Sequence, residues 1–141
     1  MNWLESESAL ESLVRQFEFG QLEEGQWHHR EHLAICYWYL CHKSLIEATY
    51  RMKLGILKYN EKYQVEQTPS RGYHETITQF FIKFLHSYVG KNPGRGVDGL
   101  NDLLRQTNGF LPHIGQYFSR PLLNSERARL QWVEPDLQAL P

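Results

Sequence analysis

The sequence predicts an all-α fold, a bundle of four main helices followed by a short helical C-terminal segment. Three observations support this prediction. Apolar residues recur every three or four positions in several long stretches, no alternating strand pattern of useful length occurs, and glycines and prolines separate the stretches. With 141 residues, the chain has the length of one ordinary domain, and we expect 1–141 to form a single core without support from a disulfide.

The first helix is expected over residues 4–18. Its apolar positions are separated by glutamates, which is the pattern of an amphipathic helix. Gly20 follows the last apolar position and marks the end of the helix, because glycine adopts the backbone conformation that terminates helices. Residues 21–26 form a polar connection.

The second helix is expected to run from about residue 28 to residue 43. On a wheel of about 100° per residue, His29 and His32 fall on the same face as the apolar residues of this stretch. Arg30 lies to one side of that face, and Glu31 points away from it. Two imidazoles are therefore predicted to face the core within the first turn or so.

The third helix is predicted to begin after Ser44, since Ser44 and Glu47 form a capping box. Gly55 borders the inner stripe and permits a close helix crossing. The inner stripe consists of the residues that recur on one face, namely Leu45, Ala48, Thr49, Met52, Ile56, Tyr59 and Tyr63.

The fourth helix is expected to include residues 74–88, with His74 on its apolar face. Residues 90–96 contain three glycines and a proline and are interpreted as a turn. A short fifth helix is expected over residues 97–107 and a last one over residues 124–132. The tail at 133–137 contains a proline and is expected to be extended.

Charge and composition exclude several classes of partner. The net charge is −1 with histidine neutral, so we expect no nucleic-acid binding. No apolar run approaches the roughly 18 residues of a membrane helix. The acidic N-terminus is unlike a signal peptide, and a cytoplasmic protein is expected. Cys36 and Cys41 point roughly 140° apart on one helix, so both are expected to be reduced and buried.

Short connections predict that His29, His32 and His74 meet. The second and third helices should be antiparallel neighbours, and the fourth should again run antiparallel to the third. The second and fourth helices then start at the same end of the bundle, and their three histidines face the core there. Of the remaining histidines, His28 is expected at the surface or beside the site, and His42, His86 and His113 are expected to be structural or exposed.

Three converging imidazoles are typical of a site for one divalent transition metal, here Zn, Fe, Ni or Mn. A set of three protein ligands leaves a position for water or substrate, as in catalytic sites. Glu75 is the candidate catalytic group, because it follows a ligand and is able to act as a base. The surrounding pocket is predicted to contain the polar residues nearest to this end of the bundle, His28, Arg30, Tyr59, Asn60, Tyr73 and Thr78.

Two other hypotheses stay open. A metal-free module would bind a small anionic ligand at the positive helix starts, with help from Arg30 and Arg71. An interaction protein would form a homodimer through the surface around Trp38, which lies opposite His29. Packing of Trp38 in the core of its own chain is the alternative. Whether the protein is a monomer or a homodimer, and whether it is an enzyme, is left undecided by the sequence.

A family resemblance is carried by three motifs, Trp27-His28-His29-Arg30-Glu31-His32-Leu33, Gly72-Tyr73-His74-Glu75-Thr76 and Trp132-Val133-Glu134-Pro135-Asp136-Leu137. With these motifs the chain resembles, over most of residues 13–137, a family of small uncharacterised bacterial helical proteins. In that pattern His29, His32 and His74 match while the position of His28 varies, which implies a shared role for the three. The arrangement is also loosely similar to the three-histidine metal sites of DinB-like four-helix bundles, although the spacing departs from theirs.

Overall fold

The computed structural model describes residues 2–107 and 114–141, and over these residues the chain is helical without a strand. The all-α prediction is confirmed. The longer helices are α1 (Glu7–Glu18), α2 (His29–His42), α3 (Leu45–Lys62), α4 (Glu75–Lys91) and α5 (Gly96–Gln106). The shorter ones are a 3₁₀ turn (Ile114–Gln116), α6 (Arg120–Leu123) and α7 (Glu126–Leu130). The fifth helix thus has nearly the length of α1 and belongs to the main bundle.

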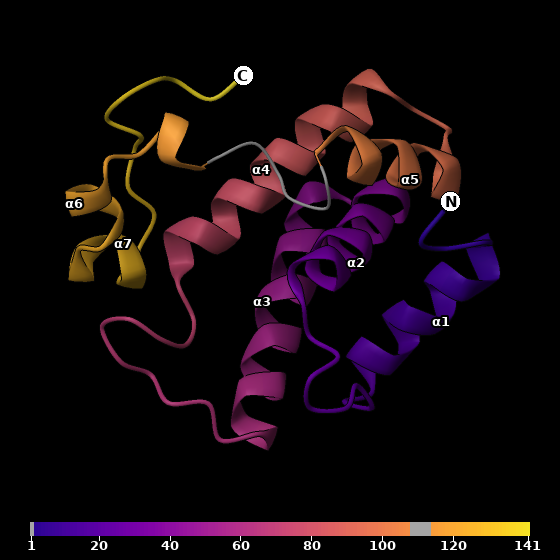
Figure 1. Ribbon diagram of the computed structural model, residues 1–141, viewed down its shortest axis with the longest axis horizontal. Coiled ribbons are helices and arrows are strands. Elements are labelled where there is room, and N and C mark those ends of the chain that lie inside the picture. The colour runs from indigo at the N-terminus through magenta and orange to yellow at the C-terminus, as the bar shows by residue number, and fades with distance from the viewer. Residues whose placement is uncertain (1, 108–113) are drawn as a thin grey trace.

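Helix α2 is the centre of the bundle, and α1, α3, α4 and α5 all pack against it (Figure 1). The run 33–37 is buried without interruption, because neighbouring helices cover every side of this helix. The expected outward orientation of Glu31 was wrong. Only 8% of Glu31 is exposed, and its carboxylate accepts a hydrogen bond from the His28 backbone N–H at 3.1 Å, so that it caps the helix.

The close helix crossing predicted at Gly55 is confirmed. A Cβ atom at this position would overlap the ring of Phe17, so only glycine allows α1 to lie this close to α3. The Phe17 ring is itself stacked on Trp27, with the two centroids 5.0 Å apart. The connection between α1 and α2 is thereby fixed to the same crossing.

The C-terminal part forms a second, smaller core against the first half of α4, where α6 and α7 lie side by side (Figure 1). Phe80 of α4 is fully buried there among residues of the C-terminal part, Tyr117, Phe118, Ala128 and Val133. The single last helix predicted over residues 124–132 is in fact shorter. The chain makes two brief helices instead, each capped by a serine, Ser119 before α6 and Ser125 before α7.

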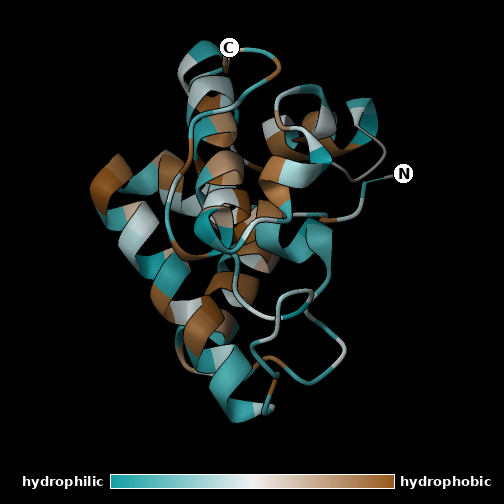
Figure 2. Cartoon of the chain, turned by 90° about the vertical axis from the view of Figure 1, so that its left-hand side faces the viewer, coloured by the Kyte–Doolittle hydropathy of each residue, from teal (hydrophilic) through white to brown (hydrophobic). Residues whose placement is uncertain are grey.

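Helix α3 differs from the prediction on its outer side. Leu45, placed in the inner stripe, is 37% exposed, while Met52 and Ile56 are buried as expected. Figure 2 shows α3 along the lower left edge of the molecule with brown, hydrophobic stretches on it. The helix is therefore apolar on both its buried and its exposed side.

Two further expectations concern the burial of the cysteines and the presence of a membrane helix. Both cysteines are free thiols, but only Cys36 is buried, and Cys41 is exposed at the end of α2. Among the described residues, we find no helix that combines the length and the apolar character needed to span a membrane.

Candidate functional site

His74 is the N-cap of α4, and both of its ring nitrogens make hydrogen bonds. Its Nδ1 accepts from the Ile77 backbone N–H at 3.1 Å, which satisfies one of the free donors of the first turn. The proton of the neutral ring is then on Nε2, which donates to the carbonyl of Leu123 at 2.8 Å. Burial lowers the pKa of His74 and outweighs the opposing effect of the Leu123 bond, so the ring is neutral near pH 7.

The residues around His74 hold the C-terminal segment on α4. Thr76 is fully buried, and its hydroxyl donates to the carbonyl of Gln131 at 2.8 Å and accepts from the N–H of Val133 at 3.3 Å. Arg129 of α7 donates to the carbonyl of Tyr73 at 3.2 Å. The Gly72–Thr76 motif therefore binds a part of its own chain about 50 residues away.

Glu75, the candidate catalytic base, joins α3 to α4. Its carboxylate lies 2.8 Å from the Lys53 ammonium and accepts a hydrogen bond from the Tyr73 hydroxyl at 2.7 Å. Burial alone would raise the pKa of Glu75, but the bonds from Lys53 and Tyr73 outweigh it and the pKa lies below its ordinary value. Burial, and next to it the hydrogen bond to Glu75, raises the pKa of Tyr73. Glu75 is thus an ionised, paired carboxylate.

The first histidine motif packs mostly through rings. Trp27 lies against His32, with centroids 3.6 Å apart, and Arg30 places its guanidinium 4.7 Å from the Trp3 ring. His29 contacts the edge of Phe81 at a centroid distance of 4.8 Å, which joins the start of α2 to α4. Burial lowers the pKa of His29.

His32 is the exception among these polar groups. Its Nε2 atom is buried and has no hydrogen-bond partner within the described residues. Burial, and next to it the charge of His29, lowers the pKa of His32 to about 3. The ring is therefore neutral at pH 7, and it retains an unused hydrogen-bonding nitrogen.

A cavity of about 180 Å³ lies where α2, α3 and α4 meet, and both His32 and His74 line it. The two helix starts thus do lie together. Tyr73 and Thr78 also line the cavity, whereas His28, Arg30, Tyr59 and Asn60 do not. Most of the wall is apolar, with contributions from Leu33, Met52, Ile56, Ile77, Phe81 and Ile82. Met52 and Ile56 belong to the predicted inner stripe of the third helix. The helical periodicity that placed the histidines on the core side could therefore have predicted these two residues at the site as well.

Two residues of the predicted metal site, His74 and Glu75, have other partners in the chain. Within residues 2–107 and 114–141, no three side chains of the His, Cys, Asp and Glu types are placed to hold one ion. His74 uses both ring nitrogens for hydrogen bonds, and Glu75 is paired with Lys53. Ligation would require these contacts to break.

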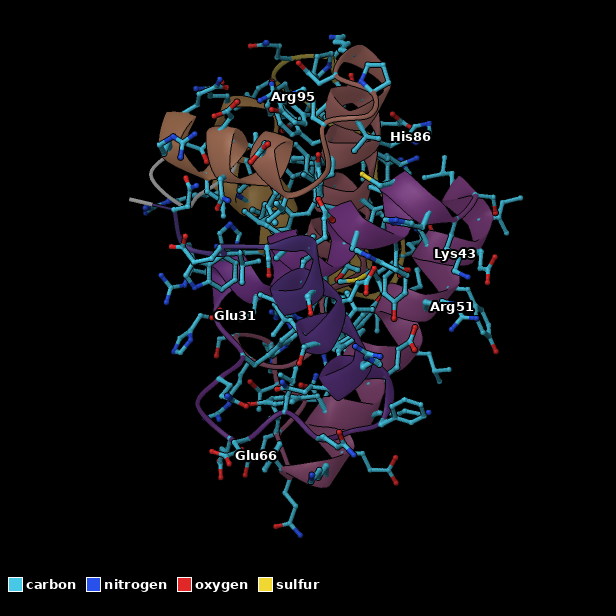
Figure 3. All side chains as sticks on the ribbon, turned by 90° about the vertical axis from the view of Figure 1, so that its right-hand side faces the viewer. Glu31, Lys43, Arg51, Glu66, His86 and Arg95 are labelled. Atoms are coloured by element: carbon cyan, nitrogen blue, oxygen red, sulfur yellow. The ribbon has the colours of Figure 1, made fainter. Side chains whose placement is uncertain are left out.

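The other histidines lie away from the cavity. His42 is exposed and its ring bonds the backbone carbonyl of Trp38 at 2.9 Å, while His86 is exposed on the outer side of α4 (Figure 3). Trp38 is partly buried against the main core and stacks on His42. His113 lies outside the described residues.

Comparisons with protein-family models, with curated proteins and with solved structures found no match to this chain.

Proposed function

We propose that this protein is a binding module for a small, neutral, largely apolar molecule that carries one hydrogen-bonding group. The cavity between α2, α3 and α4 supports this proposal through its size and its wall. Its volume is about 180 Å³, and a protein cavity of roughly 150 Å³ lined by apolar side chains accommodates benzene. The expected ligand is thus about the size of one aromatic ring with a substituent.

The unpaired nitrogen of His32 carries the proposal. A buried polar atom without a partner destabilises the fold by about 1–3 kcal/mol, and a ligand group that pairs with it recovers part of this free energy. His32 is part of the cavity wall, and a hydroxyl on the ligand is the matching group, because it pairs with Nε2 whether that nitrogen donates or accepts. Apolar contacts supply affinity, and His32 supplies selectivity.

A neutral ligand fits better than an anion. The low pKa of His32, about 3, leaves the ring without positive charge at pH 7. Arg30 and Arg71 are exposed and line no part of the cavity. The anionic alternative suggested by the helix starts therefore lacks a cation at the site.

Binding also fits better than catalysis. Cys36 lines the cavity, but burial raises the pKa of its thiol, and a neutral thiol is a poor nucleophile. Glu75 is held by Lys53 and Tyr73, and its lowered pKa makes it a weak general base.

Calorimetric titration with phenol and toluene tests the proposal, because the two probes share a shape and differ in one hydroxyl. We expect phenol to bind the wild type about tenfold more tightly than toluene, the equivalent of one hydrogen bond. In His32→Leu the two affinities should become equal. In Ile77→Trp, whose indole fills the cavity, neither probe should bind, while the control His28→Ala should behave as wild type. Phenol binding that survives Ile77→Trp, or no binding of either probe at millimolar concentration, would contradict the proposal.

The three-histidine metal site stays a prediction with a test of its own. Elemental analysis of protein purified without a histidine tag is the direct measurement. A stoichiometric metal that is lost in each of His29→Ala, His32→Ala and His74→Ala would support the metal site and would require a rearranged start of α4. A metal-free protein that still binds phenol would favour the apolar module.

A further inference from the structure

An exposed apolar stripe runs along the outer side of α3. It consists of Ile46, Tyr50, Leu54 and Leu57, which are 84%, 67%, 41% and 49% exposed. Their spacings of four, four and three residues place them in one row on the helix, opposite the buried row that contains Met52. At about 1.5 Å per residue the row is roughly 17 Å long.

Such a row is unusual on a helix that already buries its other side. A surface helix normally carries polar residues opposite its buried face, and a helix that is apolar on both sides is covered on both. In Figure 2 the outer side of α3 forms the edge of the molecule. Contiguous exposed apolar rows of this kind mark protein–protein contacts.

The order of residues in the stripe is self-complementary when a second α3 runs in the opposite direction. With a two-fold axis between positions 50 and 54, Ile46 lies opposite Leu57 of the second copy, and Tyr50 lies opposite Leu54 of the second copy. The same operation repeats both pairs on the other side of the axis. The rows of the two copies together thus form a symmetric apolar interface of four residue pairs.

Charges beside the stripe agree with the same arrangement. Glu47 and Lys58 lie on one flank, and the antiparallel register places Glu47 of each copy opposite Lys58 of the other. Lys58 is exposed and makes no ion pair within the described part of the chain. Arg51 is paired with Glu18 and with Glu47 of its own chain, and Lys53 is paired with Glu75 (Arg51 is seen in Figure 3).

We infer that α3 pairs antiparallel with α3 of a second copy, and that the stripe is a homodimer interface. This inference is independent of the proposed ligand. The cavity lies on the inner side of α3, so loss of the dimer and loss of phenol binding are separate outcomes.

Sedimentation velocity of the full chain tests the interface. We expect a dimer at 50 μM for the wild type and a monomer for Leu54→Glu, with the helical circular dichroism unchanged. Leu130→Glu is the matched control, because Leu130 is 69% exposed on α7 away from the stripe, and it should remain dimeric. Lys58→Glu should raise the dimer dissociation constant several-fold, whereas Lys91→Glu should leave it unchanged.

Cysteine cross-linking in a Cys41→Ser background tests the direction of the pair. A mixture of Tyr50→Cys and Leu54→Cys chains should form disulfide-linked heterodimers faster than either chain forms homodimers. Faster homodimers would indicate parallel helices and overturn the register. A wild type that stays monomeric at 50 μM, or a Leu54→Glu variant that stays dimeric, would overturn the interface, and so would a monomer that uses the stripe to bind a different protein.

Discussion

Two helix starts with nearly the same sequence signal are used in different ways. Both α2 and α4 begin at a histidine N-cap, His28 and His74, with a glutamate in the first turn, three residues after His28 and one residue after His74. At α4 the imidazole itself caps the helix and binds the C-terminal segment. At α2 the His28 side chain is 65% exposed, and the cap bond joins its backbone N–H to Glu31.

The difference separates a helix N-terminus that holds the fold together from one that contributes to the candidate binding site. Around His74 the polar side chains of the motif have defined partners within the chain, which is the usual state of buried polar groups. Around α2 the buried Nε2 of His32 has none among the described residues. Because an unsatisfied buried polar atom is costly, the second case is the one that points to a ligand.

The largest expected effect is the loss of His74. In His74→Ala the N–H of Ile77 and the carbonyl of Leu123 lose their partner together, and α6 loses its anchor on α4. We expect the free energy of unfolding to fall by about 2–4 kcal/mol, measured by urea denaturation.

His74→Asn is the control for this effect. Asparagine is a good N-cap but is too short to reach Leu123, so roughly half of the loss should remain. A loss below about 0.5 kcal/mol in His74→Ala would show that the two starts do not differ in the way described.

A smaller effect is expected from pH through His32. The pKa of His32 is about 3 in the folded chain, below its ordinary value of 6.5, so the unfolded chain binds the proton first as the pH falls. Through this group the folded chain is therefore most stable above about pH 6.5, and it loses stability progressively below that pH because only the unfolded chain takes up the proton. Between pH 7.5 and pH 5 the wild type should lose about 2 kcal/mol through this group.

His32→Leu isolates that contribution. Denaturation at several pH values should show a shallower dependence in this variant, with the remaining slope coming partly from His29 and His74, whose pKa values are also lowered by burial. Equal slopes in the two proteins would mean that His32 is protonated in the folded state at pH 5.

The smallest effect is expected for His28→Ala. Since the side chain is exposed and the cap uses the backbone N–H, the free energy of unfolding should change by less than about 0.5 kcal/mol. Comparison with His74→Ala under the same conditions measures how far the two caps differ. A loss in His28→Ala equal to that in His74→Ala would remove the distinction between the two starts.

The sequence was informative wherever the signal is local. Helix α2 begins and ends within one residue of its predicted bounds, and the close crossing at Gly55 followed from a missing side chain on the edge of an apolar stripe. Side-chain periodicity and capping depend on residues three or four apart, so they are readable without a fold. The boundaries of α6 and α7 were missed because helices of four or five residues are set mainly by their surroundings.

By itself the sequence determined the all-α class, the position of the long helices and the fact that histidines stand at two of their starts. Only the tertiary structure decided what those histidines do. The partner of His74 is a carbonyl 49 residues away, and a backbone carbonyl carries no mark in the sequence. His32 lines the same cavity as His74, but folding brings no such carbonyl to its Nε2 atom within the described residues. Whether a buried polar atom is satisfied depends on which distant group folding places within 3 Å of it, and that is a property of the packed chain alone.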